Sequence, residues 1–425
     1  MAGDGTLKRI YTIIFLGVFA AYVLASLILG TLTAPPELGD GQDYDSIAFN
    51  IWHGRGFGHD WDDPEWRRPY LASPIYKDVL NRHSEFYPTT YRPPAMPYLL
   101  ALVYEFAGRN FAAWRIVNCA IMAGGVAIAA AISARFAGSL AAMMTTFLSL
   151  LSPQLIGSSQ RFLTEALAAF LVTLLAWIWL SNTRRGWTIA GAARLGIVLG
   201  ALVAARSFFV LWVPIALLVP GSENSSGKRR AWRSKAVCTL ACLLVIGPWW
   251  VRNILVTRDF MPFGTQAAIG LPGGFGPSAL ESRGVWKSDN VDGMQELQAQ
   301  HLDPLTFETQ LAKFRSSLTM RWMRQHPLDV LRLMFLHVWQ ELRPRGFPFT
   351  SCVLLAGGLG AFLFRRSPGI GVITLLVFMN IVGIALTYSA EGRFMIPVQL
   401  LLVALTGALA GAAVGPKKSI LARGA

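Results

Sequence analysis

Long apolar segments dominate the chain, and most of them are separated by short polar or basic loops. A helix of about 20 apolar residues crosses a hydrocarbon core of about 30 Å. The pattern therefore predicts an all-α polytopic membrane protein with about ten transmembrane helices. The predicted spans are residues 10–32, 112–134, 139–157, 163–181, 189–204, 207–220, 236–250, 349–364, 368–388 and 394–414.

Composition agrees with this prediction. Hydrophobic residues make up 53% of the chain and charged residues 15%, whereas a soluble domain carries roughly 25% charged residues. The first apolar run follows Lys8 and Arg9 as a secretory signal would, but its length of about 22 residues exceeds the ~7–15 of a signal's apolar region. We therefore expect a retained first helix.

Basic clusters in the short loops indicate the orientation, because Lys and Arg collect on the cytoplasmic side. Both termini then lie inside. This distribution explains much of the net charge of +14 and argues against a nucleic-acid partner. The clusters are Lys8-Arg9, Arg135, Arg184-Arg185, Lys228-Arg229-Arg230 with Arg233 and Lys235, Arg365-Arg366 and Lys417-Lys418.

Two large segments, residues 33–111 and 251–348, face outward in this arrangement. Their apolar stretches at 97–106 and Pro327–Leu342 are predicted to lie as interfacial helices on the outer leaflet. The sequence shows no internal repeat and no separate soluble domain, so residues 1–425 are expected to form one transmembrane unit. Residues 221–235 are its clear cytoplasmic linker.

An acidic cluster follows the first span directly: Asp40, Asp43 and Asp45. A carboxylate there can act as a general base if it reaches the proton of an acceptor group. It can equally belong to a solvated loop or cap a helix, and capping is the better interpretation for Asp45. Glu165 opens the fourth span and is either a favourable partner of the helix dipole or a second carboxylate converging with Asp40.

Arginines at the outer ends of spans oppose the orientation rule. A phosphate ligand explains such placement, because guanidinium binds phosphate through two hydrogen bonds and stays charged. Snorkelling toward lipid headgroups explains some of them without a ligand. Arg206 and Arg393 are the strongest candidates in a group of Arg92, Arg115, Arg161, Arg206, Arg252 and Arg393.

Other reactive residue types give weaker signals. The four cysteines fall inside predicted spans and are interpreted as small buried apolar residues. His53, His59 and His83 share the first outer segment with several aspartates, but their spacing matches no metal-ligand pattern, so surface histidines are favoured. No metal ligand is assigned, and a divalent-metal requirement is left open. Residues 270–276 lack the ending of a phosphate loop and are predicted to be a mobile loop that closes over substrate.

Taken together, ordered blocks resemble the GT-C glycosyltransferases, in particular the bacterial branch related to protein O-mannosyltransferases and the lipid A aminoarabinose transferase. The blocks are Asp40-Gly-Gln-Asp-Tyr44 with Ala48 and Asn50, Gly54-Arg-Gly-Phe57, Tyr91-Arg-Pro-Pro94 with Pro97, Leu163-Thr-Glu165, Pro248-Trp-Trp-Val-Arg-Asn253 and Arg393-Phe-Met-Ile-Pro397.

The resemblance implies a GT-C fold and an inverting transfer of a sugar from a polyprenyl-phosphate donor to a glycolipid, polysaccharide or protein. The active site would face the periplasm from a bacterial inner membrane. Asp40 matches the family's acid after the first span, but Gly41 replaces the second acid of the usual Asp-Glu pair, so Asp40 or Asp43 can hold that role. Glu165 resembles the second acid.

The resemblance also implies a phosphate site at Arg393, to which Arg206, Arg252 and Arg92 are added as outward arginines. Tyr44, Tyr91 and Glu391 are assigned to substrate binding. The main alternative is a transporter or flippase of a lipid-linked anion, although no inverted repeat supports it. An O-antigen polymerase or ligase and a structural scaffold are less favoured. The sugar, the acceptor and the oligomeric state are open.

Overall fold

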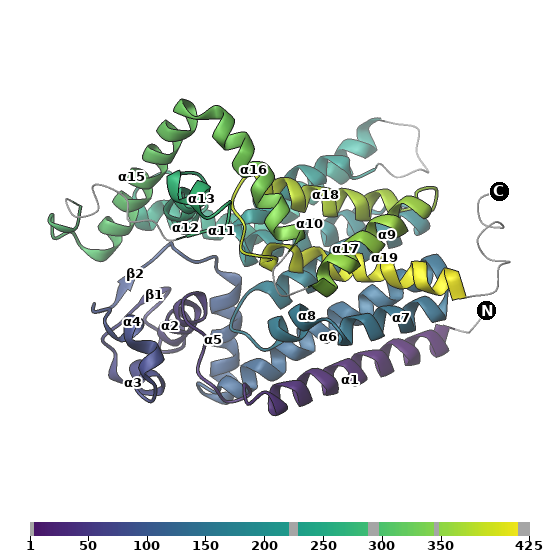
Figure 1. Cartoon of the computed structure of the whole chain (residues 1–425), viewed down its shortest axis with the longest axis horizontal. Coiled ribbons are helices and arrows are strands. Elements are labelled where there is room, and N and C mark those ends of the chain that lie inside the picture. The colour runs from purple at the N-terminus through teal and green to yellow at the C-terminus, as the bar shows by residue number, and fades with distance from the viewer. Residues whose placement is uncertain (1–3, 221–227, 288–296, 344–347, 415–425) are drawn as a thin grey trace.

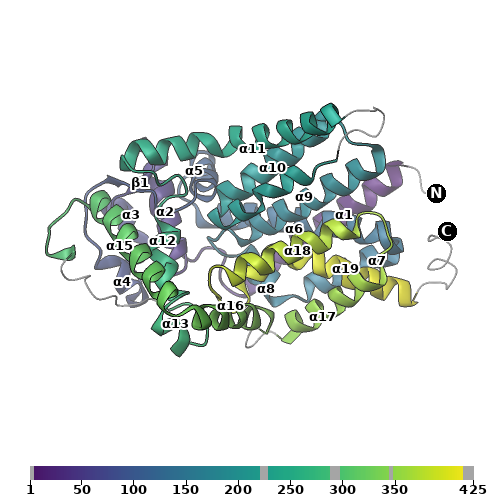
Figure 2. The same cartoon turned by 90° about the horizontal axis from the view of Figure 1, so that it is seen from above.

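The computed structural model describes residues 4–220, 228–287, 297–343 and 348–414. The helices form an elongated bundle with the first and last described residues at one end of it, and the elements of the two predicted outer segments gather at the opposite end (Figure 1). A perpendicular view shows the same separation (Figure 2). Residues 221–227 of the predicted linker and the Lys417-Lys418 cluster lie outside the described residues.

Among the described residues, five helices are long and apolar enough to span a membrane. The spanning parts are Arg9–Ile28 of α1 (Asp4–Ile28), α6 (Phe111–Ala137), α9 (Glu165–Arg185), Trp232–Thr257 of α11 (Lys228–Thr257), and Arg393–Val414, which joins η5 (Arg393–Met395) to α19 (Ile396–Val414). The chain is an all-α, multi-pass membrane protein.

The predicted span at 139–157 is instead a broken one. Helix α7 (Ser139–Leu150) and helix α8 (Pro153–Ser159) meet at an angle of 70°, and counting them as one span raises the number to six. Ser152 caps α8 by accepting the Leu155 N–H at 3.3 Å, and Pro153 follows at a position where its missing N–H costs nothing.

The remaining predicted spans contain shorter apolar helices, so a count of ten crossings is not confirmed. These elements are α10 (Ile189–Ala205), η3 (Ser207–Leu218), α17 (Pro348–Leu363) and α18 (Ile370–Ala385). Element η3 is a 3₁₀ helix that contains Pro214, a residue without the N–H that a regular helix needs.

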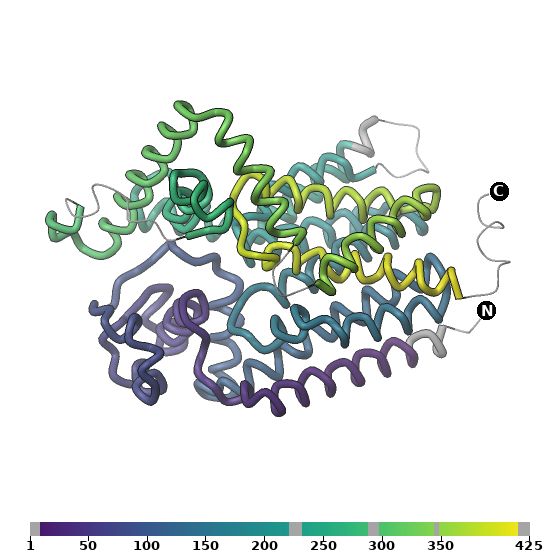
Figure 3. Tube along the Cα trace, viewed as in Figure 1, coloured from purple at the N-terminus to yellow at the C-terminus, as the bar shows by residue number. Residues whose placement is uncertain are grey.

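Helix α19 forms the centre of the bundle, with 83% of its spanning window buried, whereas α1 lies at the edge with 17% buried. The Cα trace in Figure 3 shows α19 between α7 and α18 and α1 along one side. Close approach of α19 to α7 requires glycine: a Cβ at Gly407 would lie 2.1 Å from Thr145 Oγ1, and one at Gly411 would lie 2.8 Å from Ala141 N.

The first outer segment begins with α2 (Asp40–Trp52), which follows Gly39 at a φ of 84°, a conformation that favours glycine. Two short strands, β1 (Gly58–His59) and β2 (Tyr87–Pro88), pair antiparallel. The other elements are α3 (Pro64–Arg67), η1 (Arg68–Tyr70), η2 (Pro74–Tyr76), α4 (Lys77–Leu80) and α5 (Ala95–Ala107).

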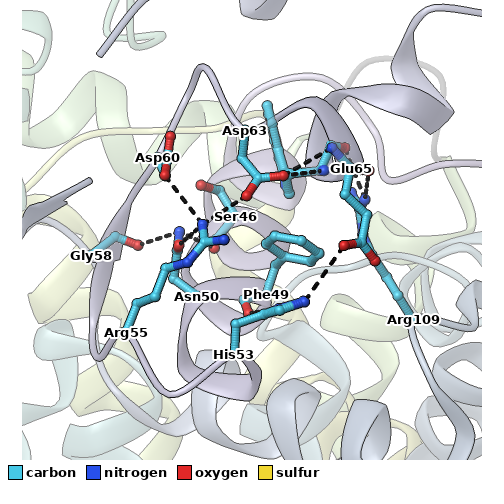
Figure 4. A network of polar contacts seen from close by, with 11 residues as sticks. Ser46, Phe49, Asn50, His53, Arg55, Gly58, Asp60, Asp63, Glu65 and Arg109 are labelled. Carbon is cyan, nitrogen blue, oxygen red and sulfur yellow. Dashed lines mark hydrogen bonds and ion pairs between the residues drawn. The ribbon is translucent and has the colours of Figure 1, made fainter. Parts of the chain in front are cut away.

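The residues from Asn50 to Phe57, which include residues of two of the family-like blocks, form a turn at the end of α2. Arg55 binds Asp63 at 2.7 Å and Asp60 at 3.1 Å, and it donates to Asn50 Oδ1 at 3.3 Å (Figure 4). Asn50 in turn donates to the Gly58 carbonyl at 3.2 Å. These contacts join the end of α2 to β1, so this part of the family resemblance describes structure and not a ligand site.

The second outer segment is helical and irregular. Its elements are α12 (Gln266–Gly270), η4 (Leu271–Gly273), α13 (Pro277–Glu281), α15 (Pro304–Gln325) and α16 (Pro327–Leu342). The two stretches predicted as interfacial helices are both helical, as α5 and α16. Helix α16 exposes Leu328, Phe335 and Trp339 and buries His337 and Glu341.

Asp45 is not a helix cap, contrary to the sequence prediction. It lies inside α2 with a fully buried side chain, and it accepts hydrogen bonds from Tyr70 Oη at 2.7 Å, from Tyr104 Oη and from Arg109 Nε at 3.1 Å. The capping interpretation missed these donors because they come from η1, α5 and the loop before α6.

We expect Asp45→Asn to destabilise the protein by about 3 kcal/mol, since removing one partner of a buried ion pair leaves the other charge unpaired. The NH₂ group of the new Asn side chain would also point at the hydrogen-bond donors that now surround Asp45. The measurement is the apparent thermal unfolding temperature in detergent. Asp62→Asn, which removes an exposed aspartate of the same segment, is the control and should leave that temperature unchanged; equal effects would contradict the prediction.

Candidate active site

A cavity of about 580 Å³ opens at the end of the bundle where the outer segments gather. Its wall combines the start of α2, the Tyr91-Arg92-Pro93 loop, the junction of α10 with η3, the segment around α12 and the loop between α18 and α19. The cavity thus joins parts of the chain that are far apart in sequence. Its charged residues are Asp40, Arg92, Arg206, Glu391 and Arg393.

Arg393 links two carboxylates at this cavity. Its Nη2 lies 2.7 Å from Asp40 Oδ2, and its Nε donates to Glu165 Oε1. Arg206 Nη1 lies 3.4 Å from the same Glu165 oxygen. Asp40 and Glu165 are the first residues of α2 and α9, where the positive end of the helix dipole favours a carboxylate.

Arg92 forms the second link, between Asp40 and Asp43. Its Nη2 lies 2.6 Å from Asp40 Oδ1, while its Nε donates to Asp43 Oδ2 at 3.0 Å. Asp43 Oδ1 is bound by Arg82 at 3.1 Å. Arg92 is 4% exposed, and its guanidinium stacks on the rings of Tyr91 and Tyr44, which favours the charged form.

Asp40 is held as an anion. Burial raises its pKa, but the guanidiniums of Arg92 and Arg393 outweigh burial and hold the pKa below the ordinary 3.8. Burial raises the pKa of the neighbouring Tyr44 to about 12, so the phenol stays neutral. The site therefore presents an ionised carboxylate between two permanent cations.

No protein-family model and no curated protein matches the chain. Among solved structures, ArnT from Cupriavidus metallidurans bound to undecaprenyl phosphate superposes with a TM-score of 0.54 at 13% identity, over 96% of this chain and 61% of ArnT. The chain has the GT-C fold. It spans about three fifths of the length of ArnT.

A second GT-C protein is also similar. The oligosaccharyltransferase AglB from Archaeoglobus fulgidus, solved with an inhibitory peptide and a dolichol-phosphate, is 14% identical, with a TM-score of 0.47 over 92% of this chain and 50% of AglB. The fold assignment rests on the ArnT comparison alone, and at 13% identity that comparison leaves activity and substrates to the site itself.

The structure brings most of the predicted site residues to one cavity. Asp40, Tyr44, Tyr91, Arg92, Arg206, Glu391 and Arg393 line it. Glu165 and Asp43 stand behind that wall, 1% and 5% exposed, and contact the lining arginines. Their roles in catalysis or binding remain predictions.

Arg252, predicted to bind the donor phosphate, does not line the cavity. Its guanidinium donates to the Thr89 carbonyl at 2.6 Å and the Phe57 carbonyl at 2.9 Å. Arg115 is occupied in the same way by main-chain carbonyls, including Ala34 at 2.6 Å. Both were grouped with the phosphate candidates because a sequence does not show which donors the folded chain has already used.

Sequence analysis missed the aromatic part of the wall. Trp286, Tyr388, Phe208 and Phe263 line the cavity, and no charge or motif distinguished them from other aromatics. The 270–276 loop was predicted to be mobile, but it contains η4 and packs closely on the α18–α19 loop. A Cβ at Gly274 would lie 2.2 Å from the Thr387 carbonyl, which explains glycine there.

Two minor predictions need correction. His59 was predicted to be a surface histidine but is 3% exposed, and burial lowers its pKa to about 4. Cys352 was predicted to be buried but is exposed, whereas Cys119, Cys238 and Cys242 are buried. Within the described residues, no group of three or more His, Cys, Asp or Glu side chains is arranged to hold a metal ion.

Proposed function

We propose that this protein is an integral-membrane glycosyltransferase that moves a sugar from a polyprenyl-phosphate donor to an acceptor hydroxyl or amine. The observation that carries the proposal is the single cavity in which Arg393 and Arg206 stand beside the ionised carboxylate of Asp40. In a displacement at a sugar carbon, a base takes the proton of the acceptor and cations stabilise the departing phosphate. This cavity contains both kinds of group.

The donor phosphate would be bound by Arg393 and Arg206. Both face the cavity from helix ends, and both are charged at any physiological pH. Apolar residues of η3 and of the segment after α18, including Phe208, Leu211 and Leu386, continue the same wall and would receive the first units of a prenyl chain. The solved GT-C structure with undecaprenyl phosphate supports this class of donor.

The proposed step is a direct displacement with inversion. The acceptor oxygen or nitrogen attacks the anomeric carbon and gives its proton to Asp40, while the bond from that carbon to the phosphate oxygen breaks. The electron pair leaves with the polyprenyl phosphate, whose additional negative charge is stabilised by Arg393 and Arg206. Glu165 balances these two arginines and holds them in place.

Asp40 is preferred to Asp43 as the base. Arginines engage both oxygens of each aspartate, but Asp43 is only 5% exposed and does not line the cavity. Asp40 lines the cavity with 28% of its side chain exposed. Asp43 is then the residue that orients Arg92.

We place the active site on the periplasmic face of a bacterial inner membrane. The elements that line the cavity lie at the end of the bundle opposite the start of α1 and the end of α19 (Figure 1). Arg135 and Arg184-Arg185 close helices α6 and α9 at that other end. Basic residues at that end favour the cytoplasm. The acceptor would be a glycolipid, a glycan or a protein.

The test is sugar release from a panel of polyprenyl-phosphate sugars by purified protein in lipid, with and without EDTA. The proposal expects at least one donor to be consumed and polyprenyl phosphate to accumulate. The same vesicles report transbilayer movement of a labelled donor. Movement without consumption would replace the transferase by a lipid transporter.

The pH profile gives a further prediction. Because the arginines depress the pKa of Asp40, its charged form is retained as pH falls from neutrality toward the ordinary value of 3.8. We expect kcat/KM, which reports the free enzyme, to stay flat from pH 7 to about 5. In the pH profile of kcat, the midpoint of the fall on the acid side should move to higher pH, because a bound phosphate competes with Asp40 for Arg393. A midpoint near pH 6 in kcat/KM would contradict this.

A further inference from the structure

The segment between α18 and α19 carries several cavity residues, among them Tyr388, Glu391 and Arg393. It is irregular: Glu391 has a φ of 52° and Gly392 a φ of 96°. A non-glycine residue in this region is uncommon and persists where its surroundings impose it. The position of Arg393 therefore depends on what holds this loop.

Glu341, near the end of α16, holds it. Its Oε1 accepts hydrogen bonds from Ser389 Oγ at 3.0 Å and from the Ala390 N–H at 2.5 Å, and its Oε2 accepts the Phe394 N–H at 3.0 Å. The bonds therefore fall on both sides of Arg393. A carboxylate suits this purpose because its two oxygens only accept.

Burying the carboxylate of Glu341 costs free energy. Glu341 is fully buried, and no ion pair to it occurs within the described residues. Burial raises its pKa, while the main-chain donors of the loop oppose that rise. A buried charge is retained only when hydrogen bonds satisfy it, and here every one of these bonds goes to the loop that carries Arg393.

Helix α16 also holds the opposite wall of the cavity. His337, one turn before Glu341, contacts the Gly274 carbonyl through Nε2 at 3.0 Å. The two walls are joined directly, because the Trp286 N–H donates to the Ser389 carbonyl at 2.9 Å. One face of α16 thus fixes the loop that contains Gly274 and the loop between α18 and α19. Helix α16 itself does not line the cavity.

Building on the proposed function, we propose that Glu341 is a positioning residue that sets Arg393 for the donor phosphate. It touches neither substrate nor the reacting atoms. It fixes the main chain on both sides of Arg393, so that the guanidinium reaches Asp40 and Glu165 at rest and the phosphate when the donor binds. A shift of about 1 Å in such a group is enough to weaken catalysis strongly.

The test compares Glu341→Gln with wild type in two assays. Gln keeps the size but presents an NH₂ group to at least one donor of the loop. We expect the affinity for undecaprenyl phosphate to fall about tenfold. Hydrogen exchange should quicken at the Ala390 and Phe394 amides. Asp329→Asn, which removes a partly exposed carboxylate from the same helix, is the matched control and should change neither.

A double-mutant cycle with Arg393→Ala separates positioning from general damage. If Glu341 acts through Arg393, adding Glu341→Gln to Arg393→Ala should change affinity less than twofold. The proposal is overturned if the effects of the two substitutions on affinity multiply. It is also overturned if hydrogen exchange at the Ala390 and Phe394 amides is unchanged in Glu341→Gln. If wild type binds no polyprenyl phosphate, the proposed function fails, and the exchange measurement alone then decides whether Glu341 fixes the loop.

Discussion

Replacing Asp40 by Asn is expected to lower the rate of sugar transfer by roughly 100-fold or more, the scale of a lost general base. The amide has nearly the same shape but cannot take the acceptor's proton. It also brings NH₂ hydrogens toward Arg92 or Arg393, whose nitrogens lie 2.6 and 2.7 Å from the carboxylate oxygens. The loss should appear mainly in kcat, because the carboxylate of Asp40 is not itself a ligand of the donor phosphate.

The measurement is single-turnover transfer with the donor found in the panel. Asp62→Asn is the matched control, since Asp62 is a 42% exposed aspartate of the same outer segment that binds Arg67 and His83. It should keep wild-type activity. Asp43→Asn should lie between the two, because it frees Arg92 without removing the base. If Asp43→Asn lost more activity than Asp40→Asn, the assignment of the base would be reversed.

The family resemblance predicted the GT-C fold, and the pattern of apolar spans predicted that distant charges meet at one end of the bundle. Charged residues at the outer ends of apolar spans can only lie in one plane, at the water boundary. Asp40 and Arg393 are 353 positions apart, yet each adjoins the outer end of a predicted span. A pattern of apolar segments is therefore enough to bring them to the same end of the bundle.

What the sequence could not give is which of these charges are already satisfied. Asp40 and Asp45 lie five positions apart on α2, but Asp45 faces Tyr70, Tyr104 and Arg109 while Asp40 faces the cavity. Arg252 and Arg206 look alike in sequence, and only tertiary contacts assign the first to main-chain carbonyls. Buried partners are supplied by other elements, so no local pattern reports them.

The predicted number of crossings is not confirmed, for a related reason. Hydropathy along 139–157 is continuous, but Ser152 and Pro153 end one helix and begin another at 70°. The segment at 207–220 is almost entirely apolar and still forms a 3₁₀ helix of 12 residues, which begins at Ser207, directly after Arg206 on the cavity wall. Apolar length predicts burial in a membrane, whereas regular spanning also needs a main chain able to stay helical.

Replacing Arg393 by Ala is expected to have the largest effect of any single change, a loss of roughly 1,000-fold in transfer. Arginines that receive developing phosphate charge contribute on this scale. Arg393 has a second task, because it is shared between Asp40 and Glu165. Its removal leaves these two carboxylates facing each other with less compensation, so affinity for polyprenyl phosphate should fall together with kcat.

Arg393→Lys discriminates between charge and geometry. Lysine keeps the positive charge but not the planar fork that reaches Glu165 through Nε and Asp40 through Nη2 at once. We expect it to recover no more than about a tenth of wild-type activity. Arg252→Lys is the comparison, since Arg252 binds carbonyls and should tolerate the change in transfer assays. Full activity in Arg393→Lys would show that the site needs only a cation there, and the shared guanidinium between the two carboxylates would then have no catalytic meaning.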